Sequence, residues 1–203
     1  MNLLRKTALA FTASALAFSL SVVQADEAAP RSNAKNNMMD PTYVSAGNGM
    51  YGEQEGAALA ASFRKPTGLV IGASDDLYIS DTGNHKIRRL SSGTVSTYAG
   101  PSSSVLRDAG GQPLGALLNG NKASALFNAP AALAYGSDKS IYVADSGNNA
   151  IRKIAPSGAV VTIAGNGKIG ASDGKGTEAT FYHPQGIAVT NSGVIYVTDT
   201  LNH

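Results

Sequence analysis

The chain has no cysteine and no tryptophan, and it carries few charges for its length. Charged residues make up 15% of the 203 positions, and aromatic residues make up 6%. Without cysteine, disulfide bonds and thiolate chemistry are excluded. The low charge and the 43% hydrophobic content also argue against a coiled coil or a disordered chain. Stability must therefore come from packing, and the length suffices for one ordinary globular domain.

A long apolar run occurs only near the N-terminus. Arg5 and Lys6 precede an apolar stretch over residues 9–23, and Val23 and Ala25 place small residues at the two positions that signal peptidase reads. This layout predicts a secretory signal peptide over residues 1–25 and export to the periplasm or the extracellular space. An uncleaved membrane anchor is the alternative, but the run is short and interrupted by Thr and Ser. We therefore expect no stable membrane span after cleavage.

The charge of the mature chain argues against a nucleic-acid partner. The full chain has 16 basic and 14 acidic residues. Arg5 and Lys6 lie in the segment that cleavage removes, which leaves 14 of each sign. Nucleic-acid binding normally requires a basic face, so we expect no such partner. Residues 26–42 are polar and lack periodicity, which predicts a flexible leader.

One unit repeats three times along the rest of the chain. Each copy has a Phe three residues before a Pro, then a short apolar strand, then a strand that contains Tyr and ends in Asp. The Tyr-containing strands are Leu77–Asp81, Ile141–Asp145 and Ile195–Asp199. The first two copies continue into an Ile-Arg strand and a fourth strand that ends in Ala-Gly. Four short strands per unit, recurring about every 50 to 60 residues, predict an all-β fold made of β-propeller blades.

The repeated motif identifies a family resemblance. The pattern Tyr-x-x-Asp-x-x-Asn-x-x-Ile-Arg, followed by a strand ending in Ala-Gly, resembles the NHL-repeat family of propellers, in its secreted bacterial type. The resemblance covers residues 43–203 and implies blades at about 63–100, 127–165 and 181–203, the last one partial. Tyr43–Gly47 matches a fourth strand, the kind of N-terminal strand that closes a propeller ring.

The number of blades predicts an incomplete propeller. Propellers have about four to eight blades, and the family resemblance implies six. Two full blades, a partial third and a closing strand cannot form a ring. We expect the chain to be a fragment of a longer protein, with assembly of several copies or a poorly folded product as alternatives. The open edge of the third blade makes oligomerisation possible, because unpaired strand edges invite partner strands.

Asp, Asn and Arg recur at fixed spacing and are the first candidates for a site. They are Asp81, Asn84, Arg88, Asp145, Asn148, Arg152, Asp199 and Asn202. Asp and Asn bond neighbouring backbone groups in tight turns, and Arg pairs with carboxylates. A catalytic group is needed once, whereas a turn lock is needed in every blade. The repetition therefore favours a structural role over a catalytic one.

Histidine is the remaining candidate for a metal site. The three are His85, His183 and His203, and they do not occupy one common position in their units. Propeller lyases that resemble this family place metal-binding His just after the Pro of several blades. The matching residues here, Thr67, Ala131 and Gln185, are poor ligands. We predict no metal, no cofactor and no catalytic residue.

Two functions from different classes remain. The first is a binding scaffold that holds a protein, peptide or glycan through blade-connecting loops. From Gly100 to Phe127 the spacing is 27 positions, against 16 in the other connectors, so this connector carries an insertion. The candidate binding residues there are Leu106, Arg107, Asp108, Leu114, Leu117 and Leu118, and a passive surface loop fits the same segment. The alternative is part of a lactonase- or lyase-like, metal-assisted propeller enzyme whose active site needs further blades.

Overall fold

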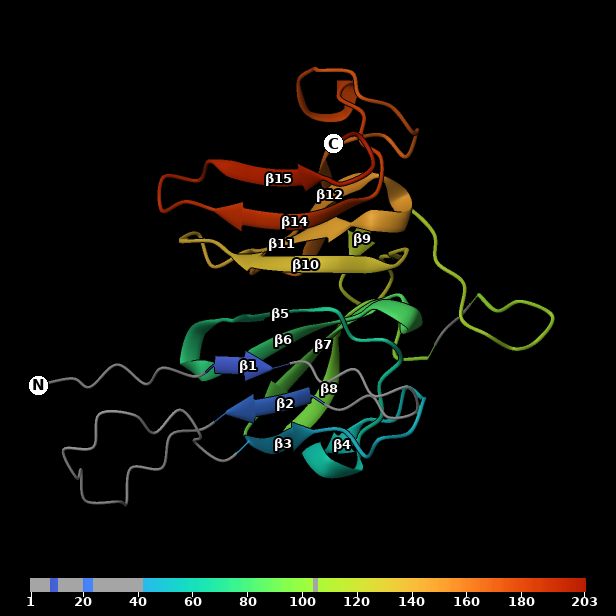
Figure 1. Ribbon diagram of the computed structural model, residues 1–203, viewed down its shortest axis with the longest axis vertical. Coiled ribbons are helices and arrows are strands. Elements are labelled where there is room, and N and C mark those ends of the chain that lie inside the picture. The colour runs from blue at the N-terminus through green and yellow to red at the C-terminus, as the bar shows by residue number, and fades with distance from the viewer. Residues whose placement is uncertain (1–7, 11–19, 24–41, 104–105) are drawn as a thin grey trace, which may run out of the picture.

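The computed structural model describes residues 8–10, 20–23, 42–103 and 106–203. These residues form four β-sheets, and the successive blades are stacked along the longest axis (Figure 1). All strand pairs in these sheets are antiparallel. Successive side chains of a strand point to opposite faces of its sheet, and the buried residues of the Leu77–Asp81 and Ile141–Asp145 strands lie on both faces, so a blade can pack on two sides. The described part of the chain contains no α-helix, only short 3-10 turns. The predicted all-β blade architecture is confirmed.

The first blade is a sheet of five strands in the order β4-β8-β7-β6-β5. Its strands are β4 (Gly56–Ala57), β5 (Gly68–Ile71), β6 (Leu77–Asp81), β7 (Lys86–Ser91) and β8 (Thr94–Ala99). Four of them were predicted from the repeat. The additional strand, β4, belongs to the connector that precedes the blade and pairs with the outer edge of β8.

The second blade repeats this arrangement in the order β10-β11-β12-β13-β9. Its strands are β9 (Gly120–Asn121), β10 (Pro130–Tyr135), β11 (Ile141–Asp145), β12 (Ala150–Ile154) and β13 (Ala159–Ala164). The short strand β9 again comes from the preceding connector and pairs with the outermost strand. Each of these two blades is therefore four repeat strands with a two-residue strand added at the rim.

The third blade consists of β14 (Pro184–Val189) and β15 (Ile195–Asp199), which pair with each other. Their register matches that of the first two strands of the second blade, since Pro184 faces Asp199 as Pro130 faces Asp145. The described blades lie side by side and do not close into a ring (Figure 1).

The N-terminal part of the described chain forms a small sheet in the order β1-β2-β3. Its strands are β1 (Ala8–Ala10), β2 (Leu20–Val23) and β3 (Thr42–Ala46). The predicted closing strand corresponds to β3, and it pairs with β2. Both β1 and β2 lie within the predicted signal peptide, so cleavage after Ala25 would remove them. The rest of the predicted signal peptide and most of the predicted leader lie outside the described residues.

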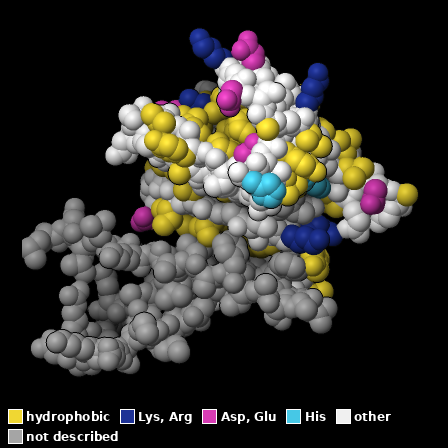
Figure 2. Space-filling model, turned by 45° about the horizontal axis from the view of Figure 1, so that its top comes forward, with side chains coloured by type: hydrophobic (Ala, Val, Ile, Leu, Met, Phe, Trp, Pro, Cys, Tyr) yellow, Lys and Arg dark blue, Asp and Glu magenta, His cyan; other side chains and the backbone are white. Residues whose placement is uncertain are grey.

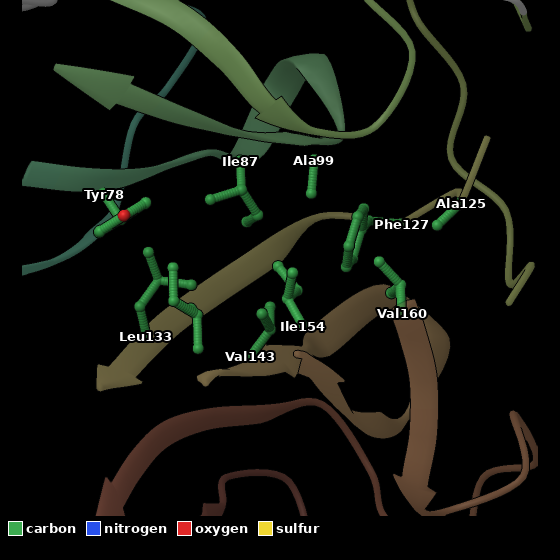
Figure 3. Close-up of a cluster of buried hydrophobic side chains, with 10 residues drawn as sticks. Tyr78, Ile87, Ala99, Ala125, Phe127, Leu133, Val143, Ile154 and Val160 are labelled. Carbon is green, nitrogen blue, oxygen red and sulfur yellow. The ribbon is translucent and has the colours of Figure 1, made fainter. Parts of the chain in front are cut away.

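Two apolar clusters pack against the two faces of the first blade. One lies between the first and second blades and joins side chains from both sheets (Figure 3). Its buried members are Tyr78, Ile87, Ala99, Ala125, Phe127, Leu133, Ile141, Val143, Ile154 and Val160. The other lies on the opposite face of the first blade and includes Ala46 of β3, together with Phe63 and Ile79. Tyr78 and Ile79 thus face different clusters, as the two-residue period of a strand requires.

Candidate functional site

The Asp81 carboxylate lies at the centre of a hydrogen-bonded cluster where β6 ends. One carboxylate oxygen accepts from the backbone N–H of Arg64 at 2.7 Å. The other accepts from Asn84 Nδ2 at 2.8 Å and from an Arg88 guanidinium nitrogen at 2.9 Å. Asn84 Nδ2 also donates to the carbonyl of Gly52. The carboxylate therefore joins the turn after β6, the β7 strand and the connector that precedes the blade.

The guanidinium group of Arg88 extends the same cluster. Its nitrogens donate to the carbonyls of Ser62 and Gln54, at 3.3 and 3.0 Å. Its central carbon lies over the Phe63 ring, 5.3 Å from the ring centre, a geometry in which a cation is attracted to the aromatic face. Arg88 and Asp81 are both fully buried. The pair therefore fastens the connector to the blade from inside.

The second blade contains the same cluster. Asp145 accepts from the backbone N–H of Asn128 at 2.8 Å, from Asn148 Nδ2 at 2.8 Å and from Arg152 at 2.8 Å. Asn148 Nδ2 donates onward to the carbonyl of Ala116. We call the cluster formed by Asp, Asn and Arg in each of these two blades the blade lock.

The guanidinium of Arg152 also contacts the connector of its own blade. Its nitrogens donate to the carbonyls of Leu126 and Leu118, at 2.9 and 2.8 Å, and to Asn119 Oδ1 at 3.0 Å. The Phe127 ring lies 5.1 Å from its central carbon. Most acceptors of the two arginines are backbone carbonyls, which every residue type provides. The two locks therefore make the same contacts although their connector sequences differ.

Burial dominates the electrostatics of both locks. Removal from water raises the pKa of Asp81 and of Asp145, because desolvation disfavours a charged carboxylate, while the hydrogen-bond donors and the arginines oppose that rise. Every partner of these carboxylates is a donor, which is the arrangement that an ionised carboxylate needs. The chemistry is that of a buried ion pair whose carboxylate is fully hydrogen-bonded, while the Nε of Arg88 and of Arg152 is buried without a hydrogen-bond partner.

The third copy contains the same turn without an arginine. Asp199 accepts from the backbone N–H of Tyr182 at 2.7 Å and from Asn202 Nδ2 at 2.6 Å. Asn202 Nδ2 donates to the carbonyl of Gly170 at 2.7 Å. All three contacts have direct counterparts in the complete locks. Asp199 and Asn202 are partly exposed, whereas Asp81 and Asp145 are fully buried.

A second repeated contact, which the sequence did not predict, links each blade to the next. His85 and Asn149 follow the lock turns and have left-handed backbone conformations, with φ of 55° and 46°. His85 Nδ1 accepts from the backbone N–H of Ala129, and Asn149 Oδ1 accepts from that of His183, both at 2.9 Å. Since Nδ1 of His85 accepts, its proton lies on Nε2, 3.2 Å from the carbonyl of Pro113. Burial lowers the pKa of His85, because desolvation disfavours the charged imidazolium.

The inserted loop is tied to the first blade by side-chain contacts. Arg107 pairs with Glu53, which also binds Lys86 at 2.9 Å. Arg64 donates to the side-chain oxygen of Gln112 at 2.6 Å. Lys86 is almost completely buried under these groups. The predicted binding residue Arg107 is therefore engaged within the molecule.

The other predicted loop residues fall into two groups. Asp108 accepts from the backbone N–H groups of Gly110 and Gln112, so it organises the loop turn. The leucines stay exposed, with 40% for Leu106, 49% for Leu114, 37% for Leu117 and 50% for Leu118. Leu114 donates its backbone N–H to the carbonyl of Leu106, which brings these two residues side by side.

The hydrogen bonds also show where the insertion ends. The carbonyl of Leu118 accepts from the backbone N–H of Leu126 and from Arg152. The carbonyl of Gln54 accepts in the same way from the backbone N–H of Ser62 and from Arg88. Leu117 and Leu118 therefore belong to the part of the connector that every blade has. The extra residues lie before them, and Leu106 belongs to that added part.

The described residues hold no cluster of three or more His, Asp and Glu side chains placed to bind a metal ion. His183 Nδ1 lies 3.3 Å from the hydroxyl of Ser146, and the two ring nitrogens of His85 contact the backbone of Ala129 and of Pro113.

Among the described helical turns, none has the length and apolar composition required to cross a bilayer. On the face in Figure 2, basic and acidic side chains are scattered among polar and hydrophobic ones.

Comparisons with known proteins identify the repeat. The NHL repeat family matches residues 63–90, 127–154 and 181–203. The chloroplastic protein SUPPRESSOR OF QUENCHING 1 of Arabidopsis thaliana is 34% identical over 171 residues, which is 79% of this chain and 16% of that protein. NHL repeat-containing protein 2 of Gallus gallus is 39% identical over 67 residues, or 33% of this chain and 9% of that protein.

Solved structures agree on the fold. A Bacteroides thetaiotaomicron protein of unknown function superposes with a TM-score of 0.64 at 17% identity, covering 89% of this chain and 39% of that one. An auxiliary nutrient binding protein of the same organism superposes with a TM-score of 0.58 at 23% identity, covering 80% and 39%. The blades and their locks define a repeat protein built as a propeller segment. The chain belongs to the NHL-repeat family of β-propeller proteins, and it spans a minor part of the length of these relatives.

Proposed function

We propose that this chain is an exported NHL-propeller segment that binds a protein, peptide or glycan through the connector between its first two blades. The observation that carries the proposal is the set of exposed leucines on this connector, Leu106, Leu114, Leu117 and Leu118. Apolar side chains on a loop favour contact with a protein or peptide over a purely polar ligand.

The way the loop is held supports the same proposal. The contacts of Arg107 with Glu53 and of Arg64 with Gln112 anchor its added part to the first blade. The Asp108 turn fixes its tip. A loop ordered before binding loses less conformational freedom when a partner docks, so its affinity is higher. Rigid scaffolds that present loops are a common way to build recognition surfaces.

The binding proposal is tested by panning a display library of random twelve-residue peptides on the purified protein, with a glycan array as a second arm. The affinity of each enriched ligand is then measured for the native chain and for a Leu106→Ser/Leu114→Ser variant. We expect the variant to bind at least tenfold more weakly. Leu59, 63% exposed and outside this connector, supplies the control Leu59→Ser, which should bind like the native chain.

Two results would contradict the proposal. Equal binding by the native chain and the loop variant would place recognition elsewhere. A metal ion that copurifies in stoichiometric amount would favour the enzyme alternative, because the proposed binding role requires none. Export is tested separately by cell fractionation and by N-terminal sequencing, which should find a mature chain beginning at Asp26.

A further inference from the structure

The connector between the first two blades forms an open pocket of about 370 Å3 where the chain leaves the first blade. Its lining includes Thr97 and Tyr98 at the end of β8, Ser102 and Ser103 in the loop that follows, and Lys122 beside β9. The volume falls within the range of small-ligand pockets, about 300–1,000 Å3. Lys122 is the one charged residue in the described lining. The pocket therefore presents hydroxyl groups, an aromatic ring and a single cation.

Lys122 stands at a repeated position where the other connectors have a small residue. The backbone carbonyl at this position accepts from the N–H of the Gly directly after β3, β8 or β13. The three pairs are Gly47 with Ala58, Gly100 with Lys122 and Gly165 with Gly176, at 2.8, 2.8 and 3.1 Å. Because alanine and glycine make the same contact, the connector does not need the lysine side chain for its structure.

Two more departures from the repeat lie at the same pocket. Tyr98 takes the place of Ile163 in the second blade, two residues before the Gly. Lys86 takes the place of Ala150 as the first residue of the third strand, and its Nζ donates to the carbonyl of Ser102 at 3.2 Å. A structural group is needed in every blade, whereas a binding group is needed once. The convergence of three unrepeated side chains on one pocket therefore indicates a binding site.

Lys122 is held over the Tyr98 ring without a counter-charge. Its Nζ lies 4.2 Å from the ring centre, and Tyr78 packs edge-on against the same ring with 4.6 Å between the centroids. None of the ion pairs among the described residues includes Lys122. Burial lowers the pKa of Lys122, and the neighbouring Arg89 lowers it further, because both disfavour the charged ammonium. An anion in the pocket would supply the missing counter-charge.

The charges near the pocket leave a place for one negative charge. Asp76 pairs with Arg89 at 2.8 Å. Glu53 pairs with Lys86 at 2.9 Å. Together with their neighbours, four cations and three carboxylates lie around the pocket or are linked to its walls: Lys86, Arg89, Arg107, Lys122, Glu53, Glu55 and Asp76. The single excess positive charge matches a monoanion such as a carboxylate, whereas a phosphate dianion would be repelled by the carboxylates.

We infer that this pocket binds the carboxylate of a hexuronate unit in an acidic glycan, with Lys122 as its counter-ion. The hydroxyls of Ser102 and Ser103 can donate to and accept from the sugar hydroxyls. The apolar C–H groups of the sugar ring pack against Tyr98, whose side chain combines an apolar body with a polar end. The inference deepens the proposed function and rests on it for the use of this connector, but its residues differ from the leucines.

The test uses trigalacturonate as the probe, with its fully methyl-esterified form as a matched neutral control. Binding to the 203-residue protein is measured by isothermal titration calorimetry at low salt. We expect saturable binding of the acid. The ester should bind at least tenfold more weakly, because it has the same sugar rings but lacks the charge that Lys122 binds.

Variants copied from the other units locate the site. Lys122→Ala reproduces Ala58 of the first connector and should weaken binding of the acid at least tenfold. Tyr98→Ile reproduces Ile163 of the second blade and should weaken it about threefold or more. Lys168→Ala removes the same charge from an exposed position in the next connector and should leave binding unchanged. If Lys122→Ala does not fold, Tyr98→Ile and the ester decide the question.

Other outcomes overturn the inference. Absence of saturable trigalacturonate binding contradicts it, as does equal binding by the ester or by the Lys122→Ala protein. Tighter binding of triglutamate than of trigalacturonate would assign the pocket to an acidic peptide instead. Tighter binding of inorganic phosphate would assign it to a phosphate group. Either result would overturn the assignment to a hexuronate.

The inference and the proposed function can fail separately. The Leu106→Ser/Leu114→Ser protein should bind trigalacturonate like the unmodified chain. If Lys122→Ala has no effect on trigalacturonate while the leucine variant loses its selected ligands, only the acid pocket is wrong. If Lys122→Ala loses trigalacturonate while the leucine variant still binds its selected ligands, only the leucine surface is wrong.

Discussion

The second and third blades present the same turn in two states, with and without its arginine. Asp145 and Asp199 both accept from the backbone N–H two residues before the Pro of their unit and from the Asn three residues after them. The turn therefore forms from the first two strands alone. Arg152 adds the links to the connector and comes with complete burial of Asp145. The comparison separates the part of the motif that shapes the turn from the part that fastens the blade.

The largest expected effect comes from removing the carboxylate of the complete lock. Asp145→Ala leaves the fully buried Arg152 without its counter-charge, which typically costs about 3–5 kcal/mol. Asp199→Ala removes only hydrogen bonds at a partly exposed site, which costs about 1–2 kcal/mol. Urea unfolding of both variants and of the control Asp173→Ala measures the difference. Equal losses for Asp145→Ala and Asp199→Ala would contradict the distinction between the two states.

The contact between blades is expected to give the next largest effect. His85→Ala leaves the backbone N–H of Ala129 without its acceptor and places alanine in a left-handed conformation, so we expect a loss of about 1–3 kcal/mol. His85→Asn copies Asn149 of the second blade, which makes the same contact, and should retain most of the stability. If both variants unfold at the same urea concentration, the contact does not hold the blades together.

The same position predicts a pH dependence. Folding lowers the pKa of His85 below its ordinary value of 6.5, so the unfolded chain binds the proton more readily. The stability of the native chain relative to His85→Asn should therefore be highest above pH 6.5 and should fall as the pH drops below it. Urea unfolding of both proteins between pH 4.5 and 8 measures this difference. A constant difference across the range would show that His85 does not titrate as a buried neutral group.

The smallest effect is expected from the exposed ion pair beside the second lock. Lys153 follows Arg152 in β12 and binds Asp138 at 2.8 Å, but both side chains are partly exposed. The hydrogen bond from Lys153 lowers the pKa of Asp138. Lys153→Ala should cost less than about 1 kcal/mol, and the cost should shrink in 1 M salt. A loss as large as that of Asp145→Ala would mean that burial is not what makes the lock important.

Much of the fold could be predicted because the same residue types recur at the same positions of each repeat. The Phe, Pro, Tyr and Asp positions of each unit define the strands and turns, and the family comparison confirms the repeat. The short strands β4 and β9 could not be predicted, since Gly56–Ala57 and Gly120–Asn121 show no alternation. They exist because the outer strand offers a free edge to the connector.

The site could be predicted in part. The spacing of Asp, Asn and Arg indicated a turn lock, but the acceptors of each arginine are backbone carbonyls, which leave no signature in the sequence. The contacts of His85 and Asn149 were missed because the two residues differ in type. Both residues directly follow the Asn of the motif, and this shared position could have indicated that they make the same contact. Spacing alone also placed Leu117 and Leu118 in the insertion, whereas their hydrogen bonds place them in the common connector.

The most direct test of the lock compares one hydrogen bond in its three copies. The backbone N–H groups of Arg64, Asn128 and Tyr182 each donate to the lock carboxylate of their blade, at 2.7, 2.8 and 2.7 Å. Amide hydrogen exchange followed by NMR reports how often each bond opens. If the arginine fastens the blade, the amides of Arg64 and Asn128 exchange slowly and at similar rates, while the amide of Tyr182 exchanges roughly tenfold faster or more. Equal protection of all three amides would contradict the account.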